Sequence, residues 1–128
     1  MKITLFTSNQ PRHNFLISEL SKISKNLYVI QENSTIFHGQ VEGSYHKSKT
    51  MKMYFSKVKN AEKKIFKNNI QGLKLNNLKL LSIYPGDINY LTRKKFRSYF
   101  ESDIYIVFGS SYIKNKYLLN FLVKKKNN

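Results

Sequence analysis

The first quarter of the chain alternates between apolar runs of strand length and one stretch with helical periodicity. Residues 2–7 form a short apolar run rich in β-forming residues, and the polar residues 8–11 follow it directly. This pattern predicts a buried strand and its exit loop. An amphipathic helix is predicted over about residues 12–25, stopping near Asn26, and residues 27–30 predict a second buried strand. The apolar face of the helix comprises Phe15, Leu16, Leu20 and Ile23. Strand, helix and strand in this order indicate a βαβ unit and therefore a parallel sheet.

The middle of the chain contains a polar stretch and then the longest helical pattern. Residues 33–47 are rich in Gly, Asn and Ser and predict a loop. Residues 48–68 predict a helix with one apolar face and lysines lying mostly away from it. That apolar face comprises Met51, Tyr54, Phe55, Val58, Ala61 and Ile65. Residues 78–83 then predict a third strand, closed by a turn at residues 85–87.

The last third of the chain again alternates between helical and strand patterns. Leu91, Phe96, Tyr99 and Phe100 suggest a short helix with Thr92 near its N-cap. Residues 104–108 (IYIVF) give the clearest prediction of a buried strand in the chain. Small residues at 109–111 predict a tight turn into a final helix. The apolar residues of that helix are Ile113, Tyr117, Phe121 and Leu122.

These elements predict an α/β fold: an open, parallel, Rossmann-like sheet with helices on both faces. We expect residues 1–128 to form one domain, because a chain of 128 residues has room for little more. The predicted order ends on a helix with no further strand to follow it. We therefore expect the domain to be incomplete at its C-terminus.

Composition narrows the function classes. The chain has no Cys, which excludes disulfides, thiolate metal sites and cysteine nucleophiles. No signal peptide is recognisable, and the longest apolar run is far below the length of a membrane span. We therefore expect a cytoplasmic protein that does not associate with membranes.

The net charge of +16 suggests nucleic acid or another anionic partner. However, the 23 basic residues include only three Arg, and they accompany fourteen Asn and many Ile. Lys, Asn and Ile have A/T-rich codons, whereas selection for phosphate or base recognition favours the bidentate Arg fork. Codon bias on a solvated surface is therefore the preferred explanation, and nucleic acid is the less favoured partner.

Two loops are candidates for binding, because ligands of open parallel sheets lie at the carboxyl ends of the strands. One follows the first strand, where Arg12 and His13 stand at a predicted helix N-terminus that favours an anion. The other comprises Gly109, Ser110 and Ser111 after the fourth predicted strand. Both could instead be ordinary surface turns, and no dinucleotide or phosphate-loop fingerprint is present.

Catalytic and metal-binding patterns are not found among the remaining residues. The three His are His13, His38 and His46, and no two of them have metal-ligand spacing. His38 and His46 lie in the predicted polar loop, far from any nucleophile turn. We expect no metal site and no catalytic residue in this chain.

Several stretches in the same order resemble the N-terminal half of the folate-dependent formyltransferase family, which includes methionyl-tRNA formyltransferases and sugar N-formyltransferases. The stretches are residues 3–13 (ITLFTSNQPRH), 86–89 (GDIN) and 103–114 (DIYIVFGSSYIK), with Leu118-Leu119 and, between the first two, Tyr54-Phe55, Val58, Ala61-Glu62 and Ile65-Phe66. Together they span nearly the whole chain.

The resemblance implies transfer of a formyl group from 10-formyltetrahydrofolate to an amine acceptor, such as a nucleotide-linked amino sugar or an aminoacyl-tRNA. In the family this chemistry depends on an Asn-x-His motif after the last helix present here and on a later Asp. No His follows His46 and no Asp follows Asp103. The resemblance thus predicts an inactive fragment, and the A-rich codons of the Lys-Lys-Lys-Asn-Asn end suggest a truncated or frameshifted product.

The resemblance also assigns two binding loops. It implies that Ser8 and Asn9, together with Arg12 and His13, bind the substrate, and that Phe108, Gly109, Ser110 and Ser111 wall the pocket of the folate co-substrate. Two other interpretations of the function remain open at this point. One is a small basic nucleic-acid-binding protein that uses the Lys-rich helix 48–68, and the other is a folate or nucleotide-sugar binding module without turnover.

Overall fold

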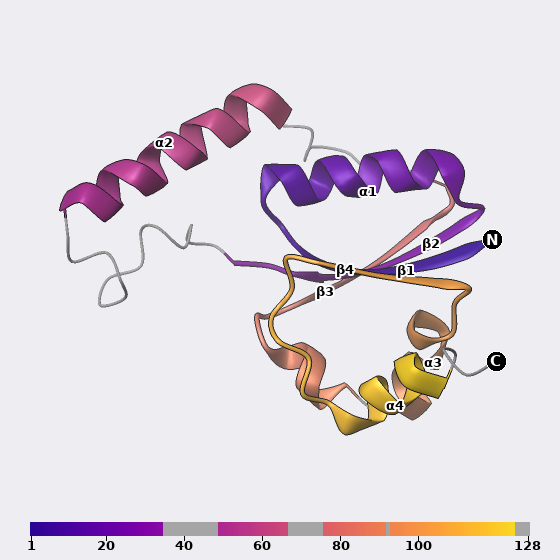
Figure 1. The fold of residues 1–128 in the computed structure, drawn as a ribbon. Coiled ribbons are helices and arrows are strands. Elements are labelled where there is room, and N and C mark those ends of the chain that lie inside the picture. Colours follow the sequence, from indigo (N-terminus) through magenta and orange to yellow (C-terminus); the bar gives the residue numbers. More distant parts are fainter. Residues whose placement is uncertain (35–48, 67–75, 92, 125–128) are drawn as a thin grey trace.

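The computed structural model describes residues 1–34, 49–66, 76–91 and 93–124. Four strands form one sheet in the order β3-β2-β1-β4, and each neighbouring pair is parallel. The strands are β1 (Lys2–Ser8), β2 (Asn26–Glu32), β3 (Leu78–Ile83) and β4 (Ile104–Phe108). Helices alternate with the strands along the chain, so the predicted α/β class and the open parallel sheet are confirmed (Figure 1).

Helices lie on both faces of the sheet, as Figure 1 shows. Helix α1 (Pro11–Ile23) covers one face, while the short helix η3 (Asp87–Tyr90), α3 (Arg93–Phe100) and α4 (Lys116–Lys124) cover the other. Because side chains alternate along a strand, β1 contributes to two cores. Leu5 belongs to the cluster on the α1 side, and Phe6 belongs to the cluster on the α3 and α4 side.

Two helix boundaries differ from the predicted ones for local reasons. Helix α1 ends at Ile23, because Ser24 already has extended backbone angles and Asn26 begins β2 instead of stopping the helix. Helix α4 begins at Lys116 rather than near Ile113, because the side-chain oxygen of Asn115 accepts the amide protons of Tyr117 and Leu118 and so caps the helix. The expected cap at Thr92 lies outside the described residues.

Strand β4 is an edge strand, which corrects the expectation that residues 104–108 form a buried strand. It pairs with β1 on one side only, and Val107 is 55% exposed. Its five apolar residues are typical of a strand covered on both sides, yet Ile104 and Phe108 are also exposed. The central strand is instead β1, which is buried from Ile3 to Thr7.

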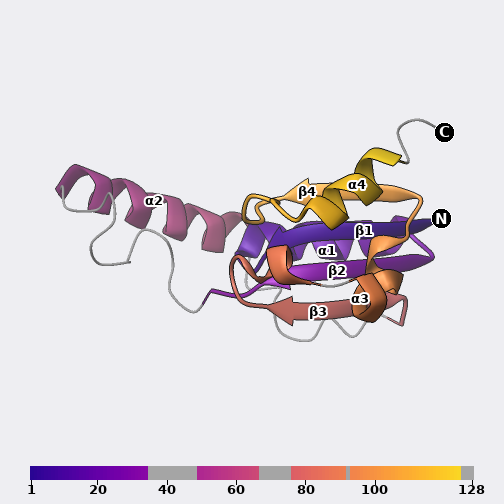
Figure 2. The same cartoon turned by 90° about the horizontal axis from the view of Figure 1, so that it is seen from below.

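Helix α2 (Lys49–Phe66) extends beyond the end of the sheet next to α1 (Figures 1 and 2). Its predicted apolar face does not enter the core: Tyr54 is 57% exposed and Ile65 is 70% exposed, and the buried residue of this helix is Glu62. The face opposite the lysines is therefore not a core face in this structure. Within the described residues, no helix combines the length and the apolar character that crossing a membrane would require.

Candidate functional site

A cavity of about 170 Å³ lies at the carboxyl ends of β1, β2 and β4. The chain leaves β1 toward β2 on one side, and β4 returns on the other side of β1, so this is the switch point of the sheet, where open α/β folds bind ligands. The cavity is lined by Ser8, Asn9, Gln10, Arg12, His13, Glu32, Ser34, Pro85, Gly109, Ser110 and Ser111.

The two loops expected to bind ligands thus face the same cavity. Ser8, Asn9, Arg12 and His13 lie on one side of it, and Gly109, Ser110 and Ser111 lie on the other. Phe108 does not line the cavity but packs edge-on against the imidazole of His13, with ring centroids 5.3 Å apart. His38 and His46 lie outside the described residues. Among the described residues, no group of His, Asp and Glu could hold a metal ion.

Glu32, at the end of β2, holds two loops in place around the cavity. Its carboxylate is buried and accepts hydrogen bonds from the amide of Ser111 at 2.8 Å, the hydroxyl of Ser111 at 2.6 Å and the amide of Gly86 at 3.3 Å. A buried carboxylate is costly unless its oxygens are hydrogen-bonded, and three donors meet that requirement here. Sequence reasoning missed Glu32, although an acidic residue at the end of a buried strand was a usable signal.

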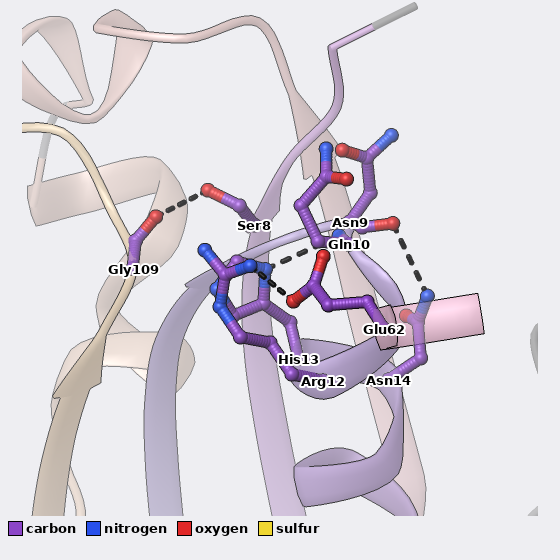
Figure 3. A network of polar contacts seen from close by, with 8 residues as sticks. All are labelled: Ser8, Asn9, Gln10, Arg12, His13, Asn14, Glu62 and Gly109. Carbon is purple, nitrogen blue, oxygen red and sulfur yellow. Dashed lines mark hydrogen bonds and ion pairs between the residues drawn. The ribbon is translucent and has the colours of Figure 1, made fainter. Parts of the chain in front are cut away.

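The loop after β1 is held by contacts with β2 and with the loop after β4. The hydroxyl of Ser8 donates to the carbonyl of Gly109, which joins this loop to the one after β4 (Figure 3). The side chain of Gln31 donates to the carbonyl of Ser8 at 3.0 Å and to the side chain of Asn14 at 2.8 Å. These contacts fix the end of β1 before any ligand binds.

The amides at the start of α1 are already occupied, which distinguishes this helix end from a phosphate cradle. Pro11 has no N–H, the amide of Gln10 donates to Nδ1 of His13 at 3.1 Å, and the amides of His13 and Asn14 donate to the carbonyl of Gln10. An anion at a helix N-terminus is normally bound by several free amides. Here that capacity is largely used by the chain itself.

Arg12 is also engaged, because its guanidinium forms an ion pair with Glu62 of α2 (Figure 3). Glu62 is buried, and this pair joins α2 to the start of α1 together with the ring contact between Phe15 and Phe66 at 5.4 Å. Arg12 remains 40% exposed, and a guanidinium has five N–H donors, so it keeps donors for a ligand.

His13 is the most unusual group at the site. It is only 2% exposed, and burial together with the positive charge of Arg12 lowers its pKa to about 4, so the imidazole is neutral near pH 7. Nδ1 accepts the Gln10 amide, and the ring proton is therefore on Nε2. Among the described residues, Nε2 has no hydrogen-bond partner.

Buried polar atoms without a partner concentrate at this end of the sheet. In the described part of the chain they are Nε2 of His13, Oγ1 of Thr7 at the end of β1, and Oε2 of Glu62. Most buried polar atoms in folded proteins are paired, so unpaired ones mark strain, a ligand site or an ordered water. All three belong to, or directly adjoin, residues that line the cavity.

Comparison of the chain with protein-family models, with curated proteins and with solved structures finds no match.

We expect the stability of the protein to fall as the pH is lowered from 6.5 to 4, with a contribution from His13. The folded pKa near 4 lies below the ordinary value of 6.5, so the unfolded chain binds the extra proton in this window. The contribution is fully present above pH 6.5 and is lost on approaching pH 4, and we expect it to be about 3 kcal/mol. Chemical denaturation of the wild type and of His13→Gln at several pH values measures it, because the carboxylates titrate in both proteins. Parallel pH profiles for the two proteins would contradict the prediction.

Replacing the carboxylate of Glu32 is expected to loosen the loop after β4. Glu32→Gln replaces one acceptor oxygen by an NH₂ group, which then faces the donors that this oxygen accepts from. The change should lower the free energy of unfolding by about 1–3 kcal/mol and speed hydrogen exchange at the Ser111 amide. The matched change Glu19→Gln removes an exposed carboxylate paired with Lys22 and should cost less than about 0.5 kcal/mol. Equal losses in the two variants would show that Glu32 does not organise the site.

Proposed function

We propose that this chain is the ligand-binding N-terminal half of a folate-dependent formyltransferase domain. One observation carries the proposal: the two loops that resemble the family's substrate loop and folate-pocket loop face one cavity at the switch point of a 3-2-1-4 parallel sheet. The ligands are 10-formyltetrahydrofolate as co-substrate and an amine acceptor, such as a nucleotide-linked amino sugar or an aminoacyl-tRNA.

The cavity supports a role in binding the reactive end of a larger ligand. Its volume of about 170 Å³ is below the roughly 300–1,000 Å³ of pockets that enclose whole small molecules. It therefore suits a terminal group, while the rest of the ligand lies along the open carboxyl edge of the sheet. The groups that line it are the hydroxyl oxygens of Ser110 and Ser111, whose protons are already donated to the Ser111 carbonyl and to Glu32, and the remaining N–H donors of Arg12. The Nε2–H of His13 has no partner among the described residues and lies against Gly109.

The proposal concerns binding and not turnover by these residues. The Asn-x-His motif and the later Asp on which the family's chemistry depends do not occur in the 128 residues.

Two glycines of this site, Gly109 and Gly86, both have positive φ, at 76° and 89°. They differ in their surroundings, because a Cβ on Gly109 would overlap the His13 ring, whereas a Cβ on Gly86 would meet nothing within 4 Å.

This difference provides a matched test with 5-formyltetrahydrofolate as the probe in isothermal titration calorimetry. Both Gly→Ala changes impose the same kind of backbone strain. Gly109→Ala also forces the loop or the His13 ring out of place, so we expect it to weaken binding at least tenfold, whereas Gly86→Ala should stay within about threefold of the wild type. A wild-type protein that does not bind the folate would contradict the proposed function.

We propose nucleic-acid binding through α2 as a second candidate, favoured by the exposure of its charged and aromatic residues. Tyr54 is exposed, and so are most lysines of this helix. The exposed lysines are Lys49, Lys52, Lys57, Lys63 and Lys64. Cationic side chains that track a backbone and an aromatic ring that stacks on a base are the usual elements of single-strand binding.

Fluorescence anisotropy with a single-stranded oligonucleotide separates this candidate from the first. If α2 binds the strand, Lys57→Gln/Lys64→Gln should lower the slope of log affinity against log salt by roughly 1.4, since each phosphate contact contributes about 0.7. The control Lys25→Gln/Lys114→Gln makes the same change in net charge away from α2 and should leave the slope unchanged. Equal effects of the two double variants would indicate only a general attraction to the net charge of +16.

A further inference from the structure

The Nε2–H of His13 is a hydrogen-bond donor that the fold has fixed in place without using it. The backbone amide of Gln10 donates to Nδ1 at 3.1 Å, which sets the tautomer. The edge-on contact with the Phe108 ring holds the plane of the imidazole. The donor is buried, and within the described residues no acceptor reaches it. A buried donor without a partner destabilises the folded protein, and a bound acceptor would remove this cost.

Nε2 faces the loop after β4. A Cβ on Gly109 would overlap Nε2, so the Gly109 backbone lies directly against this atom, and only glycine permits the approach. Gly109 lines the cavity on the opposite side from Ser8, whose hydroxyl holds the Gly109 carbonyl. A small displacement of Gly109 away from the ring therefore opens Nε2–H to the cavity.

The surroundings determine which acceptor fits. The imidazole is neutral near pH 7, and the carboxylate of Glu32 forms part of the same lining. The amides of Gln10, His13 and Asn14 at the start of α1 are occupied, and the Arg12 guanidinium is already paired with Glu62. A doubly charged phosphate would therefore meet a neutral donor and a nearby carboxylate, whereas a planar carbonyl or carboxylate oxygen needs only one well-placed N–H.

We propose that His13 is a ligand-binding residue that donates its Nε2–H to a carbonyl or carboxylate oxygen of the ligand, with Gly109 moving aside to admit it. The inference rests on the cavity of the proposed function and assigns the chemistry of its ligand group: an sp² oxygen on a small molecule. His13 orients this group and transfers no proton.

The direct test is an NMR titration of ¹⁵N-histidine-labelled wild-type protein at pH 7, with formamide and formate as probes and inorganic phosphate as the comparison. We expect formamide or formate to move the His13 Nε2 and Hε2 resonances while Nδ1 keeps the shift of an unprotonated nitrogen. The amide of Gly109 should shift at the same ligand concentrations. If neither probe moves Nε2, or if phosphate alone moves it, the inference is wrong.

Two variants separate donation from capping. A Gln at this helix position can still accept the Gln10 amide proton, as Gln does in capping boxes, and its own N–H₂ can donate. His13→Gln should therefore keep formamide or formate binding within about threefold, whereas His13→Leu should lose about fivefold to tenfold, the value of one neutral hydrogen bond. Thermal unfolding of both variants identifies loss of fold, and the wild-type titration does not depend on them. Equal binding by His13→Leu and wild type would overturn the inference.

The outcomes also distinguish this inference from the proposed function. If 5-formyltetrahydrofolate binds but leaves Nε2 unmoved, the proposed function stands and the role of His13 is wrong. If formamide or formate moves Nε2 but the folate does not bind, the donor is real and the cavity serves another ligand with an sp² oxygen.

Discussion

The arrangement of the candidate site depends on the position of β1 between two parallel neighbours. Because β2 and β4 both run in the direction of β1, the three strands end at the same edge, with Ser8 paired to Glu32 and Thr7 paired to Phe108. The loops that follow are therefore brought face to face, although Ser8 and Gly109 are separated by 101 positions in the chain. An antiparallel β4 would place Gly109 at the opposite edge of the sheet, and no cavity would form between these loops.

Two hydrogen-bonded carboxylates place negative charge next to the cavity at the carboxyl ends of the strands. Glu32 accepts three hydrogen bonds and holds the loops after β3 and β4, while Glu62 pairs with Arg12 and joins α2 to the start of α1. Among the described residues, the exposed lysines of α2 do not line the cavity. The donors that remain at the site are the neutral imidazole of His13 and the N–H groups of Arg12 that Glu62 does not use.

Periodicity was sufficient to predict the fold class, because strand and helix patterns are local properties of the sequence. The bounds of β3 and β4 agree with the predicted residues, and those of α1 differ by one or two residues at each end. Helix α2, described from Lys49 to Phe66, lies within the predicted range 48–68. Burial was predicted less well. The apolar run of β4 and the apolar face of α2 are both exposed in part, because the pattern shows which residues could be covered and not whether another element covers them.

The two loops of the candidate site were predictable from the rule that ligands bind at the carboxyl ends of parallel strands. The position of Glu32 at the end of a buried strand was a usable signal, but the partners of Glu32 and Glu62 were not predictable, because they lie 50 or more positions away in the chain. The properties of His13 likewise depend on its contacts with Gln10, Phe108 and Gly109, and a lone histidine at a predicted helix N-terminus gives no sequence signal for them.

The central claim is that the cavity between the loops after β1 and β4 receives a ligand oxygen on His13. A crystal structure of the protein grown with sodium formate or 5-formyltetrahydrofolate tests this claim most directly. The account predicts ligand density in the cavity, an oxygen within about 3.2 Å of Nε2, and Gly109 displaced from the imidazole ring. It would be contradicted by a ligand bound elsewhere, or by a ligand in the cavity while Gly109 still covers Nε2.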